Sequence, residues 1–344
     1  MIIRPVRQSD LPALLELARS AGPGLTTLPA DPERLAQRVA WAEKTFAGET
    51  ERADADYLFV LQDGAGQVVG ITALAGAVGL REPWYNYRLG MSLSASPRLG
   101  IHRPIQTLSL ANDLCGTSEV CSLFLHADHR CGENGRLLSK SRFVFLAEFA
   151  ELFSERIIAE MRGVSNDDGQ SPFWEGLGRH FFSMPFTQAD YLTGTGNKSF
   201  IAELMPRFPV YSCFLPPTAR EVIGQVHAST RPALRLLEKE GFAHHGYIDI
   251  FDAGPVLECE TRSIRAVRDS QVLLLAVGTP PEGAVSYLIH NRQLADCRIT
   301  SAAAHVAAGT LVVSASTAQN LNLQPGAQVR AVPLNIAANG APRP

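Results

Sequence analysis

The stretch Ser122-Leu-Phe-Leu-His-Ala-Asp-His-Arg-Cys-Gly-Glu-Asn-Gly-Arg-Leu-Leu-Ser-Lys-Ser-Arg142 predicts a strand, a polar turn and a helix in succession. The turn, Arg130-Cys-Gly-Glu-Asn-Gly135, presents consecutive backbone N–H groups at a helix N-terminus, and such an arrangement binds anions. Local positive charge comes from four side chains, Arg130, Arg136, Lys140 and Arg142. The stretch therefore predicts a pyrophosphate site, with an ordinary strand–turn–helix connection and a solvated basic helix face as the alternative.

On both sides of this stretch the chain predicts mixed helices and strands. Capping residues and apolar spacing predict helices at 10–18, 31–48, 135–153, 172–182 and 231–240. Apolar runs bounded by turn residues predict strands at 2–6, 57–62, 67–75, 120–126, 156–161 and 247–251. Residues 195–212 are expected to be extended, and residues 82–103 hold strands whose ends the pattern does not place. This order predicts an α+β fold.

The last part of the chain has a different character. After about residue 258, short Val/Leu/Ile runs alternate with Gly, Pro and Asn turns, which predicts a small β-rich, barrel-like module. We therefore expect a first domain at 1–257, the β-rich module at 258–335 and a disordered tail at 336–344. Weakly similar segments at 173–182 and 234–251 leave a duplicated half-domain open within the first domain.

Composition excludes several classes of function. Of 344 residues, 46% are hydrophobic and the net charge is −3, so a core can form and no global basic field serves nucleic acid or a membrane. The six cysteines show no CxxC pair and no metal-ligand spacing, so we expect reduced thiols and no metal. The N-terminus lacks a signal peptide, and the longest apolar run, 272–277, is far below the ~20 residues of a membrane helix. We expect a soluble, cytoplasmic protein.

The order of elements resembles the GNAT fold of acyl-CoA N-acyltransferases. In that family the turn follows the pattern Arg/Gln-x-x-Gly-x-Gly/Ala and binds the pyrophosphate of CoA. Arg130 and Gly135 fit the pattern, while Glu133 stands at its central glycine and Gly132 lies one position early. The resemblance implies a GNAT-like fold with an acyl-CoA as co-substrate.

A closer resemblance, over about residues 1–334, is to the arginine N-succinyltransferase family, which includes arginine/ornithine succinyltransferase subunits. The sequence segments that carry this resemblance include Glu82-Pro-Trp-Tyr-Asn-Tyr-Arg88, Ala159-Glu-Met-Arg-Gly163, Ser171-Pro-Phe-Trp174, Gly224-Gln-Val-His227 and Tyr247-Ile-Asp-Ile-Phe-Asp252. The resemblance implies transfer of the succinyl group of succinyl-CoA to the α-amino group of L-arginine, the first step of an arginine-degradation pathway, with ornithine as a second candidate acceptor. It also implies a homo- or hetero-oligomer with a paralogous subunit.

Two alternatives to this interpretation stay open. One is a weakly catalytic or structural partner subunit of a hetero-oligomeric succinyltransferase. The other is an enzyme of the same fold that uses acetyl-CoA or another amine.

The resemblance also implies roles for individual residues. His227 is the expected proton donor, and a neutral-range pKa suits an imidazole to this role. The strand at 120–126 offers main-chain groups of Leu123 and Leu125 to the pantetheine arm, where an N–H group polarises the thioester oxygen. Arg130, Gly135 and Arg136 are expected to contact the pyrophosphate. Spacing selects neither Tyr191 nor Tyr211 as a proton source for the thiolate, and His126 and His129 are expected at the surface.

The charged groups of the substrates are expected to bind protein side chains of opposite charge. Arg88 and Arg162 are candidates to bind the substrate carboxylates, because a guanidinium binds a carboxylate bidentately. Candidates to bind the guanidinium of arginine are Glu160, Glu203 and Asp113. For each of them, a structural ion pair between neighbouring elements is the alternative.

Overall fold

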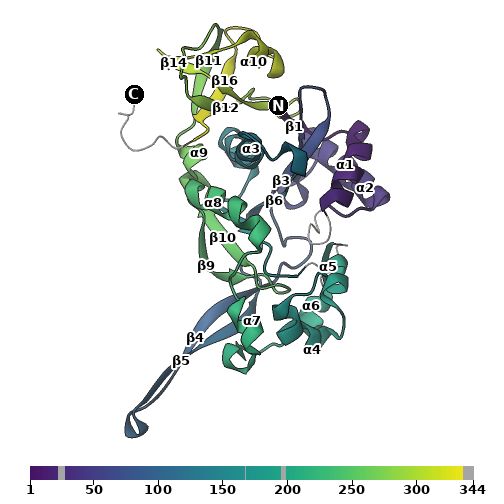
Figure 1. Cartoon of the computed structure of the whole chain (residues 1–344), viewed down its shortest axis with the longest axis vertical. Helices are drawn as coiled ribbons and strands as arrows, with labels where there is room; N and C mark the ends of the chain where they lie inside the picture. Colours follow the sequence, from purple (N-terminus) through teal and green to yellow (C-terminus); the bar gives the residue numbers. More distant parts are fainter. Residues whose placement is uncertain (22–27, 167, 195–198, 336–344) are drawn as a thin grey trace.

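The computed structural model describes residues 1–21, 28–166, 168–194 and 199–335. These residues form one 16-stranded mixed sheet with helices on both faces, an α+β architecture (Figure 1). The tail at 336–344, predicted to be disordered, lies outside the described residues, as do residues 195–198 of the stretch expected to be extended.

The part of the sheet that carries the site follows the order β1-β2-β3-β6-β7-β10-β9-β4-β5. Its strands are β1 (Ile2–Pro5), β2 (Asp56–Gln62), β3 (Val68–Ala75), β6 (Ser118–Leu125), β7 (Arg156–Glu160), β10 (Pro255–Glu260), β9 (Ala243–Ile248), β4 (Asn86–Ser96) and β5 (Ile101–Ala111). All neighbours in this order are antiparallel except β6 and β7, which run parallel.

Helices α1 (Leu11–Ala21) and α2 (Pro32–Phe46) cover one face of this sheet, and α3 (Asn134–Glu148), α8 (Arg231–Glu240) and α9 (Arg265–Arg268) cover the other (Figure 1). Strand β2 shows why both faces are covered. Leu58 and Val60 pack against α1 and α2, whereas Phe59 and Leu61 pack with residues of α3. Alternate side chains of a strand point to opposite faces, so an uninterrupted apolar strand needs a helical layer on each side.

Local chemistry sets the ends of the predicted elements. The Asp31 side chain accepts hydrogen bonds from the backbone N–H groups of Glu33 and Arg34, and Pro32 occupies the first position of α2. Asp63 Oδ1 accepts from Ala65 N and Gln67 N and so shapes the turn between β2 and β3. The helix predicted at 31–48 and the turn between the strands predicted at 57–62 and 67–75 are therefore confirmed.

The β4–β5 hairpin supplies the strands expected within residues 82–103, whose ends the sequence pattern did not place, and it continues to Ala111. Its eleven-residue strands pair from Asn86↔Ala111 to Ser96↔Ile101 and project away from the body (Figure 1). At its base lies a second core, which includes Tyr87, Leu108 and Trp174. Four helices surround this core: α4 (Arg179–Phe182), α5 (Phe186–Gly194), α6 (Ser199–Leu204) and α7 (Pro217–Glu221).

Part of the predicted extended stretch at 195–212 is wrong, because α6 occupies Ser199–Leu204 and β8 is limited to Val210–Tyr211. Tertiary contact overrides local pattern there, since Ile201 and Met205 pack into the second core. The strand expected at 247–251 begins earlier and ends earlier, as β9 (Ala243–Ile248).

The C-terminal strands form a ring-like module. Its elements are β11 (Gln271–Val277), β12 (Ser286–His290), β13 (Ile299–Ala303), β14 (His305–Ala307), β15 (Thr310–Val313), α10 (Ala315–Asn320) and β16 (Gln328–Pro333). The strands pair in the order β14-β15-β11-β16-β12-β13. The first and last strands of this order, β14 and β13, are consecutive in the chain and separated only by Ala304, so the order closes on itself. Leu275, Leu311 and Val329 are among the side chains of its own core.

The module is attached to the rest of the chain by pairing and by buried charge. Ile3 of β1 pairs with Ile299 of β13, which makes the sheet continuous. Glu240 accepts from Arg265 at 2.8 Å and lies 3.0 Å from Lys140, while Lys140 also donates to the carbonyl of Leu334 just after β16. The predicted domain boundaries at 257 and 335 stay predictions.

Candidate active site

The parallel strands β6 and β7 separate along their length and open a cavity. They pair only at Ser118↔Ile157 and Glu119↔Ile158, although β6 continues to Leu125. A cavity of about 1810 Å³ occupies this region. It is lined by residues 119–125 of β6 and 159–162 at the end of β7, together with parts of α2, α3, α8 and residues 249–252.

A β-bulge interrupts β6 within this cavity. Ile71 of β3 pairs with Phe124 and Ala73 pairs with Cys121, so Thr72 faces two residues, Ser122 and Leu123. Ser122 has φ 53°, in the left-handed region that non-glycine residues seldom adopt. A bulge bends the strand and redirects main-chain groups away from the neighbouring strand. The strand can therefore offer main-chain groups to a bound molecule.

An ion pair from α2 supports the bulge. Arg38 Nη2 donates to Ser122 Oγ at 3.0 Å, and the same guanidinium holds both oxygens of Asp56 at 2.7 and 3.1 Å. Burial lowers the pKa of Arg38, but the charge of Asp56 and its hydrogen bonds outweigh burial and raise this pKa above its ordinary value. Arg38 is therefore a fixed cation that orients Ser122.

The predicted anion turn lies at the N-terminus of α3 and lines the same cavity. A Cβ built on Gly132 or Gly135 would have nothing within 4 Å, so the backbone there is open to a bound group. Arg130 Nε donates to the carbonyl of Leu125 at 2.9 Å, which ties the turn to β6. The cavity lining includes all five residues expected to contact CoA, namely Leu123, Leu125, Arg130, Gly135 and Arg136. Their contact with CoA stays a prediction.

Glu133, which replaces a glycine of the family pattern, has partners of its own. Its Oε1 accepts from Asn335 Nδ2 at 3.0 Å and lies 3.8 Å from Arg136 Nη1. Its carboxylate is therefore held by neighbouring side chains, which reduces its repulsion of an anion at the turn.

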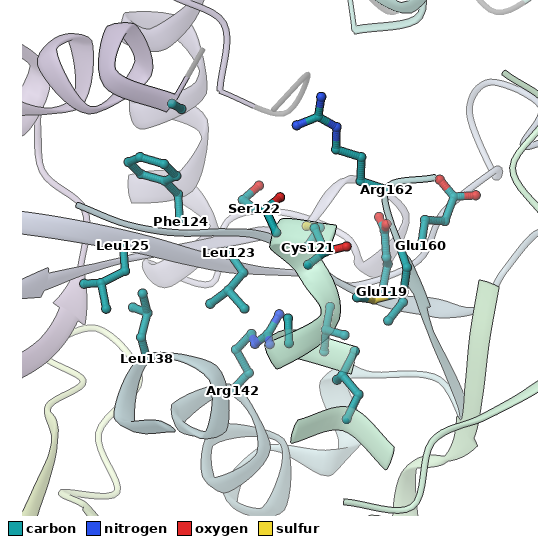
Figure 2. Close-up of a pocket in the computed structure, with 18 of the residues that line it drawn as sticks. Glu119, Cys121, Ser122, Leu123, Phe124, Leu125, Leu138, Arg142, Glu160 and Arg162 are labelled. Atoms are coloured by element: carbon teal, nitrogen blue, oxygen red, sulfur yellow. The ribbon is translucent and has the colours of Figure 1, made fainter. Parts of the chain in front are cut away.

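At the open end of β7, two predicted substrate residues also line the cavity. Glu160 Oε1 accepts from Asn86 Nδ2 at 2.7 Å and from Trp84 Nε1 at 3.2 Å. Arg162 Nη2 donates to Ser165 Oγ at 2.9 Å. Figure 2 shows Ser122 and Phe124 on one side of β6, with Leu123, Leu125, Leu138 and Arg142 on the other.

The backbone that follows β7 packs closely against residues 252–254, and this packing leaves no space for a side chain at Gly163 or Gly254. Buried Asp252 accepts from Gly163 N at 2.7 Å and from Gly254 N at 2.8 Å. A Cβ on Gly254 would lie 1.9 Å from the carbonyl oxygen of Met161, so only glycine fits. Burial, and next the charge of Asp249, raise the pKa of Asp252 well above its usual range. This packing fixes the loop at 249–252 against the end of β7.

His227 lies next to this end of the cavity. Its backbone N donates to the carbonyl of Arg162 at 2.9 Å. Its ring Nδ1 lies 2.7 Å from Ser229 Oγ and 3.2 Å from Ser229 N, and Ser229 and Thr230 line the cavity. The ring is therefore oriented by its own loop.

The remaining candidates lie elsewhere. Arg88 lies 3.8 Å from Asp113, stacks over Tyr247 at 5.8 Å and does not line the cavity, as the ion-pair alternative predicts. Glu203 and Tyr211 are exposed, and the side chain of Tyr191 is outside the described part of the chain. His126 and His129 face each other with ring centroids 6.2 Å apart and are half-buried rather than fully exposed.

Sequence reasoning missed three features of the site: the bulge, the Arg38–Ser122 contact and the burial of Arg142. The positive φ of Ser122 leaves no mark on composition or periodicity. The contact joins residues far apart in the chain, and Arg142 differs from a surface arginine only in what packs around it.

Comparisons with known proteins agree with this geometry. The family model described as the arginine N-succinyltransferase beta subunit matches residues 1–266, and that of its C-terminal domain matches residues 268–333. The arginine N-succinyltransferase subunit beta of Pseudomonas aeruginosa is 66% identical over 340 residues, which cover 99% of this chain and 100% of that protein. An arginine N-succinyltransferase of an Enterobacter species is 48% identical, over 97% of this chain and 98% of that protein.

A solved structure has the same fold along its length. Subunit AI of an arginine/ornithine succinyltransferase from Pseudomonas aeruginosa superimposes with a TM-score of 0.88 and 34% identity, over 97% of this chain and 99% of that one. Among the described residues, no helix has the length and apolar character needed to span a membrane. The separated parallel strands, the anion turn and this full-length similarity agree, and the chain is a GNAT-like acyltransferase that belongs to the arginine N-succinyltransferase family.

Proposed function

We propose that this chain transfers the succinyl group of succinyl-CoA to the α-amino group of L-arginine, giving N2-succinyl-L-arginine and CoA. The observation that carries the proposal is one continuous cavity that joins the anion turn, the bulged strand and the charged end of β7. The family, whose members are named for this reaction, supports the same conclusion.

In this proposal, the co-substrate lies along β6. The pyrophosphate binds at the N-terminus of α3, where Gly135 allows close approach and Arg130 and Arg136 add charge. The pantetheine arm follows the main chain of Leu123 and Leu125. At the bulge, a redirected N–H group donates to the thioester oxygen, whose negative charge grows as the amine attacks.

Transfer forms a C–N bond and breaks the C–S bond of the thioester. The ammonium group of arginine loses a proton before attack, and the departing thiolate takes one up. We assign His227 to this proton transfer. Because Nδ1 accepts a hydrogen bond from Ser229 N at 3.2 Å, Nε2 is the nitrogen that we assign to the proton exchange.

For the acceptor, we assign Glu160 to the guanidinium of arginine and Arg162 to its α-carboxylate. Both line the cavity at the end of β7, and they carry the two charges that the amino acid requires. Arg88 was the third candidate. We leave it out of this assignment because it pairs with Asp113 outside the cavity lining.

We also propose that the working enzyme is an oligomer, with identical or paralogous subunits, and that it acts in the cytoplasm. The projecting β4–β5 hairpin exposes large apolar side chains, namely Met91, Leu93, Leu99 and Ile101. Exposed apolar groups in such number are typical of subunit interfaces.

The test is thiol release from succinyl-CoA by the purified chain with L-arginine or L-ornithine, and with acetyl-CoA as the control donor. Fast release that requires arginine and succinyl-CoA is the expected result. No release from a folded chain would favour the alternative, a structural partner subunit, and the assay would then be repeated with a co-purified partner.

A further inference from the structure

Arg142 is a buried cation on the cavity wall. It lies on α3, is 2% exposed and lines the cavity with Glu119, Cys121 and Leu123 of β6. Figure 2 shows its side chain on the α3 side of β6, beside the part of the strand that contains the bulge. It is therefore near the position assigned to the thioester rather than near the anion turn.

Among the described residues, the hydrogen-bond acceptors of the Arg142 guanidinium are neutral. Its Nε donates to the carbonyl of Ser139 at 3.0 Å and its Nη2 to Ser139 Oγ at 3.1 Å, both on its own helix. Within the described ranges, no carboxylate oxygen lies within 4.0 Å of it. Burial lowers the pKa of Arg142 to about 10, against the smaller opposing effects of Cys121 and Glu119.

Other buried cations nearby are paired. Lys140, on the same helix, lies 3.0 Å from Glu240, and Arg265 donates to the same carboxylate at 2.8 Å. A buried charge without a counter-ion is costly, and a wall of the cavity is a place where a bound anion removes that cost. Arg142 is thus a cation without a protein counter-ion in the described structure.

We propose that Arg142 binds the terminal carboxylate of the acyl group and makes the cavity select a dicarboxylic acyl donor over a simple one. The inference rests on the proposed function and adds its donor specificity. Two methylenes join the thioester carbonyl to the succinyl carboxylate, so that carboxylate lies within roughly 4 Å of the thioester carbon. A donor without a carboxylate leaves the guanidinium unpaired, and the site therefore disfavours it.

The other charged side chains that line the cavity lie farther from the position assigned to the acyl group or have a different charge or partner. Arg130 and Arg136 lie at the anion turn, and Arg162 lies at the end of β7. Glu119, which also lines the cavity, repels a carboxylate and so opposes binding on its side of the bulge. Arg38 contacts Ser122 at the bulge, but its guanidinium is paired with Asp56. Among the described residues, Arg142 is therefore the cation without a carboxylate partner that we place closest to the acyl chain.

The experiment compares binding of succinyl-CoA and butyryl-CoA, which differ in the terminal carboxylate, by isothermal titration calorimetry. We expect the parent chain to bind succinyl-CoA at least ~10-fold more tightly, and Arg142→Gln to abolish this preference while it binds butyryl-CoA as the parent does. Arg142→Lys, which keeps the charge, is expected to restore part of the preference. Arg235→Gln is the matched control, because Arg235 is an exposed cation that lines the same cavity.

The outcomes separate this inference from the proposed function. Equal affinity of the parent for the two donors overturns the inference, and so does a preference that Arg142→Gln retains. An equal loss of affinity for both donors, or unfolding of both variants by circular dichroism, assigns Arg142 a structural role and also overturns it. Because binding is measured without arginine, an Arg142-dependent preference supports the inference even where the chain fails to release thiol.

Discussion

Two histidines illustrate how surroundings decide the role of one residue type. His227 is half-buried beside the cavity, with Nδ1 close to Ser229 Oγ. His290 is fully buried, and its Nδ1 accepts from Arg292 N at 2.7 Å while its Nε2 lies 3.3 Å from Cys297 Sγ. We assign the first to proton exchange with the substrate, whereas burial keeps the second neutral.

For His227, we predict that His227→Ala lowers kcat by ~10²-fold or more, because a positioned acid–base group contributes in that range. Thiol release at saturating substrate measures the effect, and the melting temperature checks that the fold is kept. His245→Ala is the control, because His245 is exposed on β9 and neither it nor its neighbours along the chain line the cavity, whereas Ser229 and Thr230 beside His227 do. Turnover equal to the parent in a folded His227→Ala variant would contradict the assignment.

For His290, we predict a loss of stability at acidic pH. Burial, with the charges of Arg330 and Arg292, lowers the pKa of His290 to about 3. The unfolded imidazole takes up a proton below about pH 6.5, whereas the folded one stays neutral, so acid favours the unfolded state. Stability is complete above about pH 6.5 and falls by up to ~1.4 kcal/mol per pH unit between there and about pH 3.

Urea unfolding of the parent and of His290→Gln, from pH 7 to pH 4, measures this effect. Each free energy of unfolding is compared with its own value at pH 7, so a general loss of stability in the variant cancels. The variant is expected to show a shallower decline. Parallel pH dependence in the two proteins would show that His290 is not the responsible group.

At the residue scale, the sequence predicted groups whose position follows from local backbone. The anion turn needed only a strand, a turn and a helix in order, whereas the expected roles of Leu123 and Leu125 came from the family resemblance. The pairing of Arg88 with Asp113 and the unpaired burial of Arg142 depend on packing between distant segments, which periodicity does not encode.

At the scale of elements, the central feature is the bulge that separates the pairing of β6 with β3 into two registers. Ser122 combines a positive φ with a hydrogen bond from Arg38. We predict that Ser122→Val destabilises the fold by ~1–3 kcal/mol, since a β-branched side chain is strained in this conformation. We expect it also to lower kcat/KM, because we assign the main-chain contacts to the thioester to the bulge.

Ser122→Gly is the matched variant for this prediction. Glycine adopts the same φ without strain but loses the hydroxyl, so only the hydrogen bond is removed, at a cost of ~1 kcal/mol. Urea unfolding and thiol release on the two variants separate backbone strain from the hydrogen bond. Equal stability of the Val and Gly variants would contradict a strained bulge.

Elements with strong local signals were predicted well, and α2 and the β2–β3 turn owe their ends to Asp31 and Asp63. The β4–β5 hairpin was not placed, because its outer half is exposed and lacks the alternation of a half-buried strand. Helix α6 was missed because contacts of Ile201 in the second core outweigh a weak local preference.

At the scale of the whole molecule, the exposed hairpin bears on assembly. We predict that replacing Met91 and Leu93 by serine lowers the oligomeric state, because these side chains are 67% and 58% exposed in the isolated chain. Size-exclusion chromatography with light scattering measures the mass. The matched control replaces Leu274, an exposed residue of β11 in the C-terminal module, by serine. An unchanged mass for the hairpin variant, or a monomeric parent, would contradict this role.

The central claim is that one cavity unites a succinyl donor with the α-amino group of arginine. Tandem mass spectrometry of the product formed by the purified chain from succinyl-CoA and L-arginine tests it most directly. The account predicts arginine with one added succinyl group, and fragments that place this group on the α-nitrogen. Unmodified arginine from a folded chain, or succinylation of the guanidino group, would contradict it.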